Sequence, residues 1–174
     1  MALVGIFCVA LLVMTTLIHY EVLRGLTVSL PRIWIHARAK LVVVIFGTFL
    51  AHFLEIILYA FSIYFLARHG HYGMLGDAGR FSLDACLYFS AETYTSLGYG
   101  DIVPGGGLRM LAGFETLNGL LLIGWSASYT YIAMARFWDE DGGRIKYDEQ
   151  KPSGIIRHAA RRREGRLRNR MPRR

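Results

Sequence analysis

A ten-residue stretch from Thr95 to Pro104 combines glycine, tyrosine, aspartate and proline in the order TSLGYGDIVP. Gly98 and Gly100 break any regular helix or strand, so this backbone is irregular. The chain on both sides is apolar enough to lie in a lipid bilayer. Irregular backbone at that depth is tolerated only where protein surrounds it or where it lines a water-filled cavity. The sequence therefore predicts a loop in one of these two settings.

A second group of reactive side chains lies deep in another apolar run. His52 and Glu55 are three residues apart, a spacing that places both on one face of a helix. Ionisable groups at membrane depth are rare and usually face protein, and the pattern is not HExxH, so it predicts no zinc hydrolase. Two interpretations stay open: a hydrogen bond that docks another helix or subunit, and a proton-sensing switch. Possible partners are Glu115 and Asn118, whereas His19 is expected near the cytoplasmic side.

Composition indicates a membrane protein, because 53% of the 174 residues are hydrophobic. Three apolar runs can span a bilayer, at residues 1–20, 40–67 and 108–138. The first has no basic segment before it and no small-residue cleavage site after it, which favours a retained helix over a signal peptide. A shorter run, 82–94, begins at Ser82, a typical N-cap residue. It is too short to span and leads into the glycine-rich loop, so it predicts a re-entrant helix.

Basic residues are spread unevenly along the chain. They crowd into the connection 21–39 and the tail 139–174, and they are scarce in the apolar runs. The positive-inside rule places these two segments in the cytoplasm, with the N-terminus and the loop 95–101 outside. The tail is either a solvated segment that enforces topology or a contact for anionic lipid headgroups, and no motif in it predicts nucleic-acid binding. The candidate lipid contacts are Arg161, Arg162 and Arg163.

The sequence around the loop resembles a known family. TSLGYGD is similar to TVGYGD, the selectivity filter of potassium channels, and the likeness extends through Pro104, Arg109, Gly119 and Gly124. It covers residues 40–138 and looks like the pore domain of small bacterial potassium channels, a family that includes the two-pore-domain channels. The resemblance implies an all-α membrane protein with three transmembrane helices, a re-entrant pore helix and a filter loop. It also implies a homotetramer in the plasma (inner) membrane.

The resemblance assigns potassium binding to the backbone carbonyls of the filter. Carbonyls replace the water around an ion without a fixed charge that would trap it, and Gly98 and Gly100 permit the left-handed dihedrals this needs. One loop cannot ring an ion, so the chain must assemble, most simply as a symmetric tetramer. Serine stands at position 96 where threonine is usual, which predicts a looser innermost site. The implied ligands are Ser96, Leu97, Gly98 and Tyr99.

Other residues are expected to support this filter. Glu92 is expected close to Asp101, either sharing a proton with it or bonding the backbone near the filter. Tyr88 and Phe89 are expected to form an aromatic cuff around Tyr99. The implied support residues are Tyr88, Phe89, Glu92, Thr93, Thr95, Gly100 and Asp101.

The gating candidates are small or ionisable residues within the spans. Gly119 is expected either to act as a hinge in the inner helix or to allow close helix packing. The others are Gly124, His52 and Glu55. The implied function is passive potassium conduction, with K⁺ as the permeant ion and no enzyme activity, cofactor, small-molecule substrate or nucleic-acid partner. A weakly selective cation channel and a non-conducting membrane subunit remain alternatives.

Overall fold

The computed structural model describes residues 2–69, 72–76 and 82–150. This part of the chain is helical and contains no β-strand, which confirms the predicted all-α class there. Its elements, in chain order, are α1 (Ala2–Ser29), a short 3₁₀ turn η1 (Leu30–Arg32), α2 (Ala37–Arg68), α3 (Leu83–Tyr94) and α4 (Leu108–Gln150).

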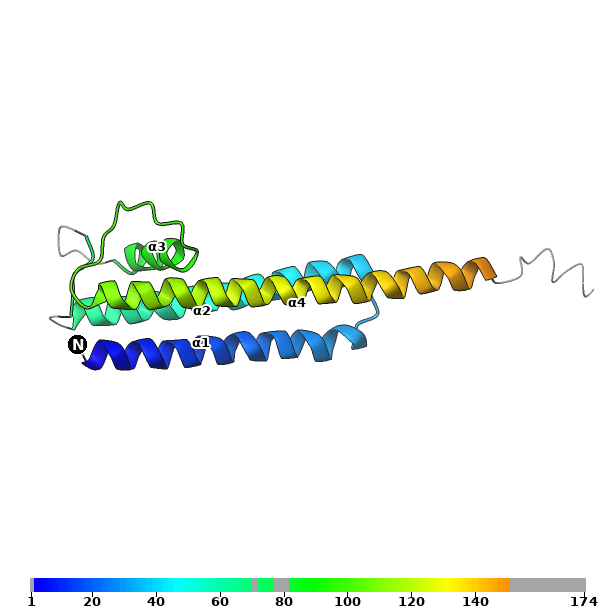
Figure 1. The fold of residues 1–174 in the computed structure, drawn as a ribbon, viewed down its shortest axis with the longest axis horizontal. Helices are drawn as coiled ribbons and strands as arrows, with labels where there is room; N and C mark the ends of the chain where they lie inside the picture. The colour runs from blue at the N-terminus through cyan, green and yellow to red at the C-terminus, as the bar shows by residue number, and fades with distance from the viewer. Residues whose placement is uncertain (1, 70–71, 77–81, 151–174) are drawn as a thin grey trace, which may run out of the picture.

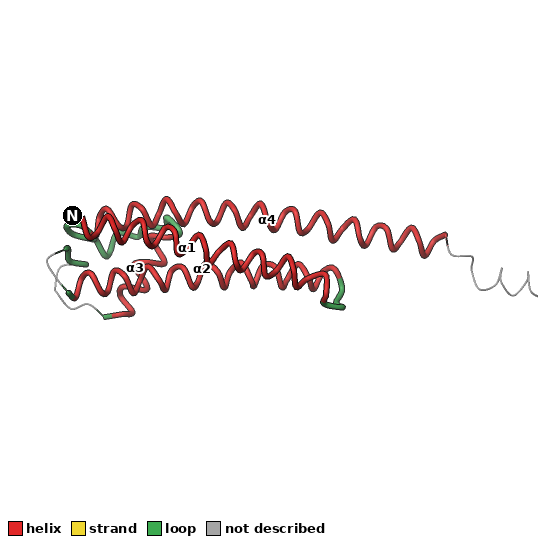
Figure 2. The backbone as a smooth tube through the Cα atoms, turned by 90° about the horizontal axis from the view of Figure 1, so that it is seen from below, coloured by secondary structure: helices red, strands yellow, loops and turns green. Residues whose placement is uncertain are grey.

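The three long helices α1, α2 and α4 run side by side, and the short α3 lies at one end of them (Figure 1; Figure 2). The long helices contact one another, and α3 packs against α2 and α4. The N-terminus lies at the α3 end, so α1 and α4 both run away from that end and α2 runs back toward it. The main apolar core lies where all four helices meet, and its largest fully buried members include Tyr59, Ile63, Leu66, Tyr94, Leu108 and Leu111.

The short helix begins and ends as predicted. The Ser82 side chain accepts a hydrogen bond from the main-chain N–H of Ala85 at 3.1 Å, so Ser82 is the N-cap. Asp84 lies in the first turn, where a negative charge is favourable. The last residue is Tyr94, immediately before the glycine-rich loop. α3 therefore sets the position from which that loop emerges.

The first helix is longer than predicted, because it continues beyond residue 20 to Ser29. Glu21 and Arg24 end the apolar run, but they form an i,i+3 ion pair at 3.4 Å that is compatible with a helix. The helix ends just before Pro31, whose ring disfavours helical dihedrals in the preceding residue. The predicted cytoplasmic connection 21–39 is therefore helical over much of its length.

The last helix is also longer than predicted. The polar segment after Trp138 reads as a linker from its sequence, yet α4 continues to Gln150. Two consecutive glycines, Gly142 and Gly143, lie within it and cost about 1 kcal/mol each relative to alanine. That cost does not stop a helix already extended from Leu108, because each further residue adds a main-chain hydrogen bond.

Within the described residues, two helices are long and apolar enough to cross a membrane. They comprise Ala2–Arg32 and Arg38–Arg68. α4 is not among them, and polar residues such as Glu115, Asn118 and Ser126 lie along it. The third predicted span therefore stays a prediction.

The segment before α4 pairs with the segment that follows α2. The main-chain N–H of Gly105 donates to Met74 O at 2.7 Å, and that of Gly107 donates to Tyr72 O at 2.6 Å. A Cβ atom at position 107 would lie 2.8 Å from the same Tyr72 oxygen. A glycine is therefore required there, because the two backbones approach too closely for a side chain. This pairing fixes the start of α4 beside the end of α2.

Candidate functional site

The loop after α3 has left-handed backbone at every second residue. Its φ angle is positive at Ser96 (62°), Gly98 (54°) and Gly100 (78°), which are every second residue. This confirms the predicted left-handed dihedrals of the two glycines. Ser96 adds a third left-handed position that the sequence did not indicate, at a cost of roughly 1–2 kcal/mol for a residue with a Cβ atom. With this alternation, successive carbonyl oxygens can point to one side of the loop.

Glu92 holds the loop from behind. Its main-chain oxygen accepts hydrogen bonds from the N–H groups of Leu97 at 2.8 Å and Gly98 at 3.3 Å. Its carboxylate Oε2 accepts from the N–H of Tyr99 at 3.2 Å. The N–H groups of three successive loop residues, Leu97 to Tyr99, are thus bound to Glu92.

The contacts of Glu92 bear on its two predicted roles. The carboxylate is buried and bonds the loop backbone, which confirms the simpler interpretation. Asp101 accepts a hydrogen bond from the main-chain N–H of Ile102 at 3.1 Å. A proton shared between the two carboxylates stays a prediction.

The predicted aromatic cuff is not present within a single chain. Phe89 is buried in the main core, whereas the side chain of Tyr99 is 69% exposed. Among the described residues, no ring contact joins Tyr99 to Tyr88 or Phe89. Any cuff around Tyr99 would need a neighbouring subunit.

Threonine hydroxyl groups form hydrogen bonds at the end of α3. The hydroxyl of Thr116 on α4 donates to Thr93 O at 3.0 Å, and the same oxygen accepts from the N–H of Ser96 at 3.1 Å. The Thr95 hydroxyl donates to Ala91 O at 2.7 Å, within the last turn of the helix. These bonds join the loop, α3 and α4.

Gly119 lies directly against this end of α3. A Cβ atom there would be 2.3 Å from the main-chain oxygen of Tyr94 and 3.0 Å from its Cγ. Close packing through a small residue is therefore confirmed, while a hinge at Gly119 stays a prediction. Gly124 differs, because a Cβ there would meet nothing within 4 Å.

A closed ring of buried polar side chains lies behind the loop and joins all four helices. His19 Nδ1 lies 2.9 Å from Glu55 Oε1, and the Tyr94 hydroxyl donates to Glu55 Oε2. His52 Nδ1 lies 2.9 Å from the Tyr94 hydroxyl oxygen. The Ser126 hydroxyl closes the ring, at 3.0 Å from His52 Nε2 and 3.1 Å from His19 Nε2. The docking interpretation of Glu55 is thus confirmed, and His19 lies inside the bundle because α1 continues beyond it.

The hydrogen bonds of this ring specify its protons. Tyr94 donates to Glu55, so both imidazoles must present an Nδ1–H, one to Glu55 and the other to the Tyr94 oxygen. The single proton of the Ser126 hydroxyl can serve only one of the two Nε2 atoms. The other Nε2 can bond the Ser126 oxygen only if it carries a proton itself.

Glu115 and Asn118, which were expected as partners of His52 and Glu55, form other buried polar contacts. The Asn118 amide donates to Thr15 Oγ1 at 2.7 Å and to the Tyr59 hydroxyl at 3.1 Å, which joins α4, α1 and α2. The Ser90 hydroxyl lies 2.5 Å from Glu115 Oε1. Among the described residues, Glu115 Oε2 has no hydrogen-bond partner. Glu115 and Asn118 therefore form contacts of their own and are not part of the ring.

A protein-family model described as "ion channel" matches residues 39–136, which is more than half of the chain. The chain belongs to this ion-channel family. The matched range contains most of α2, α3, the glycine-rich loop and most of α4. No curated protein and no solved structure matches the chain.

Membership of the ion-channel family supports passive ion conduction rather than an enzymatic reaction. Together with the two apolar helices, it indicates a membrane protein. The match does not include α1, so the contacts of α1 with the channel domain come from the structure alone. The candidate lipid contacts Arg161, Arg162 and Arg163 lie outside the described residues.

Three residues of the ring were not assigned to it from the sequence: His19, Tyr94 and Ser126. In the structure His19 belongs to a stripe of buried positions on α1 that recur every three or four residues, at Val4, Cys8, Leu11, Thr15, His19 and Leu23. That stripe places His19 on the inner face. Tyr94 and Ser126 have no comparable local signal, because their roles depend on how separate helices meet.

We expect Gly119→Ala to destabilise the folded channel by about 1–3 kcal/mol, because the added methyl group must displace the main chain of Tyr94. Gly124→Ala is the matched control on the same helix and should leave stability nearly unchanged or slightly raised. Thermal unfolding in detergent, followed by tryptophan fluorescence, measures both. Equal midpoints for the two variants would contradict the close packing of α3 on α4.

Proposed function

We propose that this chain forms a potassium-selective channel that conducts K⁺ passively through a homotetrameric pore. One observation carries the proposal: dihedrals alternate along the loop while its N–H groups are bound to Glu92. The carbonyls of residues 96–99 are then the groups left to bind an ion. Backbone carbonyls that replace a hydration shell are the ligands of potassium filters.

The tetramer follows from what a single loop lacks. Oxygens from one loop cover only one side of an ion, and a closed symmetric assembly supplies the others. In the single chain, Leu97 is 57% exposed and Tyr99 is 69% exposed. Apolar and aromatic side chains on a filter wall need neighbours, and further copies of the chain would provide them. Fourfold symmetry is the arrangement that the filter resemblance implies.

The third span of the proposed pore is α4. Its 43 residues extend over roughly 65 Å at about 1.5 Å per residue, which exceeds the bilayer core of roughly 30 Å. Its polar residues Glu115, Asn118 and Ser126 are buried against the other helices, which is where polar groups of membrane helices usually lie. The lower hydropathy of α4 is therefore compatible with a membrane-spanning position.

The arrangement of the helices supports the proposed orientation. The loop and the N-terminus lie at one end of the bundle, and the connection between α1 and α2 lies at the other (Figure 1). That connection and its flanks carry the basic residues Arg24, Arg32, Arg38 and Lys40. The positive-inside rule then places it in the cytoplasm and the loop outside, in the plasma membrane.

Two alternative functions would give different results in a measurement of ion flux. A weakly selective cation channel would follow from the loose innermost site that Ser96 predicts. A non-conducting subunit would use the chain only for lipid or partner binding, through the arginines at positions 161–163. The gating assignments of Gly119, Gly124, His52 and Glu55 stay predictions.

The test is ion flux into liposomes that contain the purified protein. We expect K⁺ flux with little Na⁺ flux from the parent chain and at least tenfold less K⁺ flux from Gly98→Ala. Gly76→Ala is the matched control, because both glycines have a positive φ (54° and 70°) and neither has an atom within 4 Å of an added Cβ. The two substitutions strain the backbone alike, but only one lies in the filter.

Equal K⁺ and Na⁺ flux would favour the weakly selective alternative, and no flux from a folded tetramer would favour the non-conducting one. Particles of any other stoichiometry in a cryo-electron microscopy map would contradict the fourfold pore. Loss of flux in both glycine variants would show that backbone strain anywhere outside the helices is sufficient to stop conduction.

The Ser96 hydroxyl is the proposed innermost ligand of the filter. Ser96→Thr keeps this oxygen, and we expect it to retain K⁺ selectivity. Ser96→Ala removes the oxygen, and we expect K⁺ flux to fall by about tenfold, equivalent to about 1.4 kcal/mol for one lost ligand. Flux and K⁺/Na⁺ permeability ratios in liposomes measure both variants. An unchanged Ser96→Ala variant would show that the hydroxyl does not bind the ion.

A further inference from the structure

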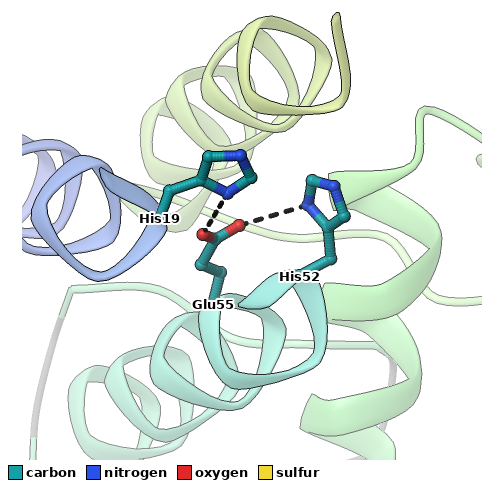
Figure 3. Close-up of side chains that lie close together, drawn as sticks. All are labelled: His19, His52 and Glu55. Carbon is teal, nitrogen blue, oxygen red and sulfur yellow. Dashed lines mark hydrogen bonds and ion pairs between the residues drawn. The ribbon is translucent and has the colours of Figure 1, made fainter. Parts of the chain in front are cut away.

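We propose that His19, His52 and Glu55 form a binding site for a divalent transition-metal ion, with Zn²⁺ as the best fit. Figure 3 shows both imidazole rings turning Nδ1 toward the same carboxylate. One potential ligand atom from each residue lies within 4.8 Å of the other two. This inference does not depend on the proposed conduction, because metal binding is measured without ion flux.

The distances from the two imidazoles to Glu55 are close to those of a zinc site. With zinc bonds of about 2.0–2.2 Å, the ligand atoms of a tetrahedral site lie about 3.3 Å apart. His19 Nδ1 and Glu55 Oε1 are 2.9 Å apart, and His52 Nδ1 and Glu55 Oε2 are 3.3 Å apart. Each histidine contacts a different oxygen of Glu55, so the three side chains would need to draw together around an ion.

The surroundings of the two rings also fit a metal centre. A metal-binding imidazole usually bonds an oxygen atom through its other nitrogen, which fixes the ring orientation. Here His52 Nε2 and His19 Nε2 lie 3.0 Å and 3.1 Å from one oxygen atom, that of Ser126. A single residue of α4 thus orients both rings from behind.

A fourth ligand is within reach. The Tyr94 hydroxyl lies 2.9 Å from His52 Nδ1 and bonds Glu55 Oε2, so it adjoins two of the proposed metal-binding atoms. His19 and Glu55 are fully buried, whereas the His52 side chain is 18% exposed and offers a route of entry. Two imidazoles and one carboxylate favour zinc and its neighbours over the hard ions Mg²⁺ and Ca²⁺, which prefer oxygen ligands.

Metal binding must be balanced by protons. A metal at both Nδ1 atoms requires each neutral ring to carry its proton on Nε2, where it can donate to Ser126. Any further imidazole proton is released to water on binding, and so is the Tyr94 proton if Tyr94 binds as tyrosinate. The ion takes over the role of the ring protons in joining α1, α2 and α3.

The first test uses the unmodified chain in detergent. We expect one Zn²⁺ per chain, measured by elemental analysis after dialysis, and a dissociation constant in the micromolar range or tighter by calorimetry. Co²⁺ should occupy the same site and show the intense visible absorption of tetrahedral coordination. X-ray absorption of the zinc form should show two imidazoles and one or two further oxygen ligands. No binding, or octahedral Co²⁺ with oxygen ligands alone, would overturn the proposal.

The second test locates the site. His19→Gln, His52→Gln and Glu55→Gln should each weaken Zn²⁺ binding at least tenfold, and Ser126→Ala should weaken it about tenfold by freeing the rings. His36→Gln, a change to an exposed histidine, is the control and should bind as the parent does. Parent-like affinity in the ring variants would place the metal elsewhere and overturn the proposal. If a variant fails to fold, the X-ray absorption result on the parent decides.

Discussion

The buried hydrogen bond from Tyr94 to Glu55 fixes the end of α3, and the geometry of the loop depends on it. The same residue touches α4 through its main chain, where only a glycine at position 119 leaves room for its oxygen. Tyr94 is thus held from two sides, and the loop starts at the next residue. Glu92, two residues before Tyr94, then binds the N–H groups of Leu97, Gly98 and Tyr99. These bonds anchor the loop to the end of α3.

The polar groups behind the loop stabilise one particular packing of the helices. A buried ionisable group without partners costs several kcal/mol, so an arrangement that left Glu55 or either histidine unpaired would be strongly disfavoured. Apolar contacts alone tolerate small rotations and translations of helices in lipid, because the lipid chains are as apolar as the side chains. The ring and the Thr15–Asn118–Tyr59 cluster fix the relative positions of the helices at two places along the bundle. Fully bonded polar networks of this kind specify a unique structure.

The sequence predicts features that depend on neighbouring residues better than features that depend on contacts between separate helices. The cap of α3 at Ser82 and the left-handed dihedrals of Gly98 and Gly100 follow from local chemistry, and both were predicted correctly. The ends of α1 and α4 were not, because a charged or glycine-containing segment can continue a helix once it has formed. Tertiary contacts decide the remainder: no local pattern shows that Ser126 would meet two histidines from other helices. The positive φ of Ser96 likewise follows from the anchoring by Glu92 and not from its residue type.

The contacts of α1 show that it is an integral part of the channel domain, although the family match begins only at residue 39. His19 supplies one of the two imidazoles of the ring, and Thr15 accepts a hydrogen bond from Asn118 on α4. Without α1, Glu55 would keep its bonds to α2 and α3 but lose the partner of Oε1 in a buried place. Asn118 would lose one acceptor, and the inner faces of α2 and α4 that α1 covers would be opened. A two-helix pore built from this sequence would therefore need different residues at positions 55 and 118.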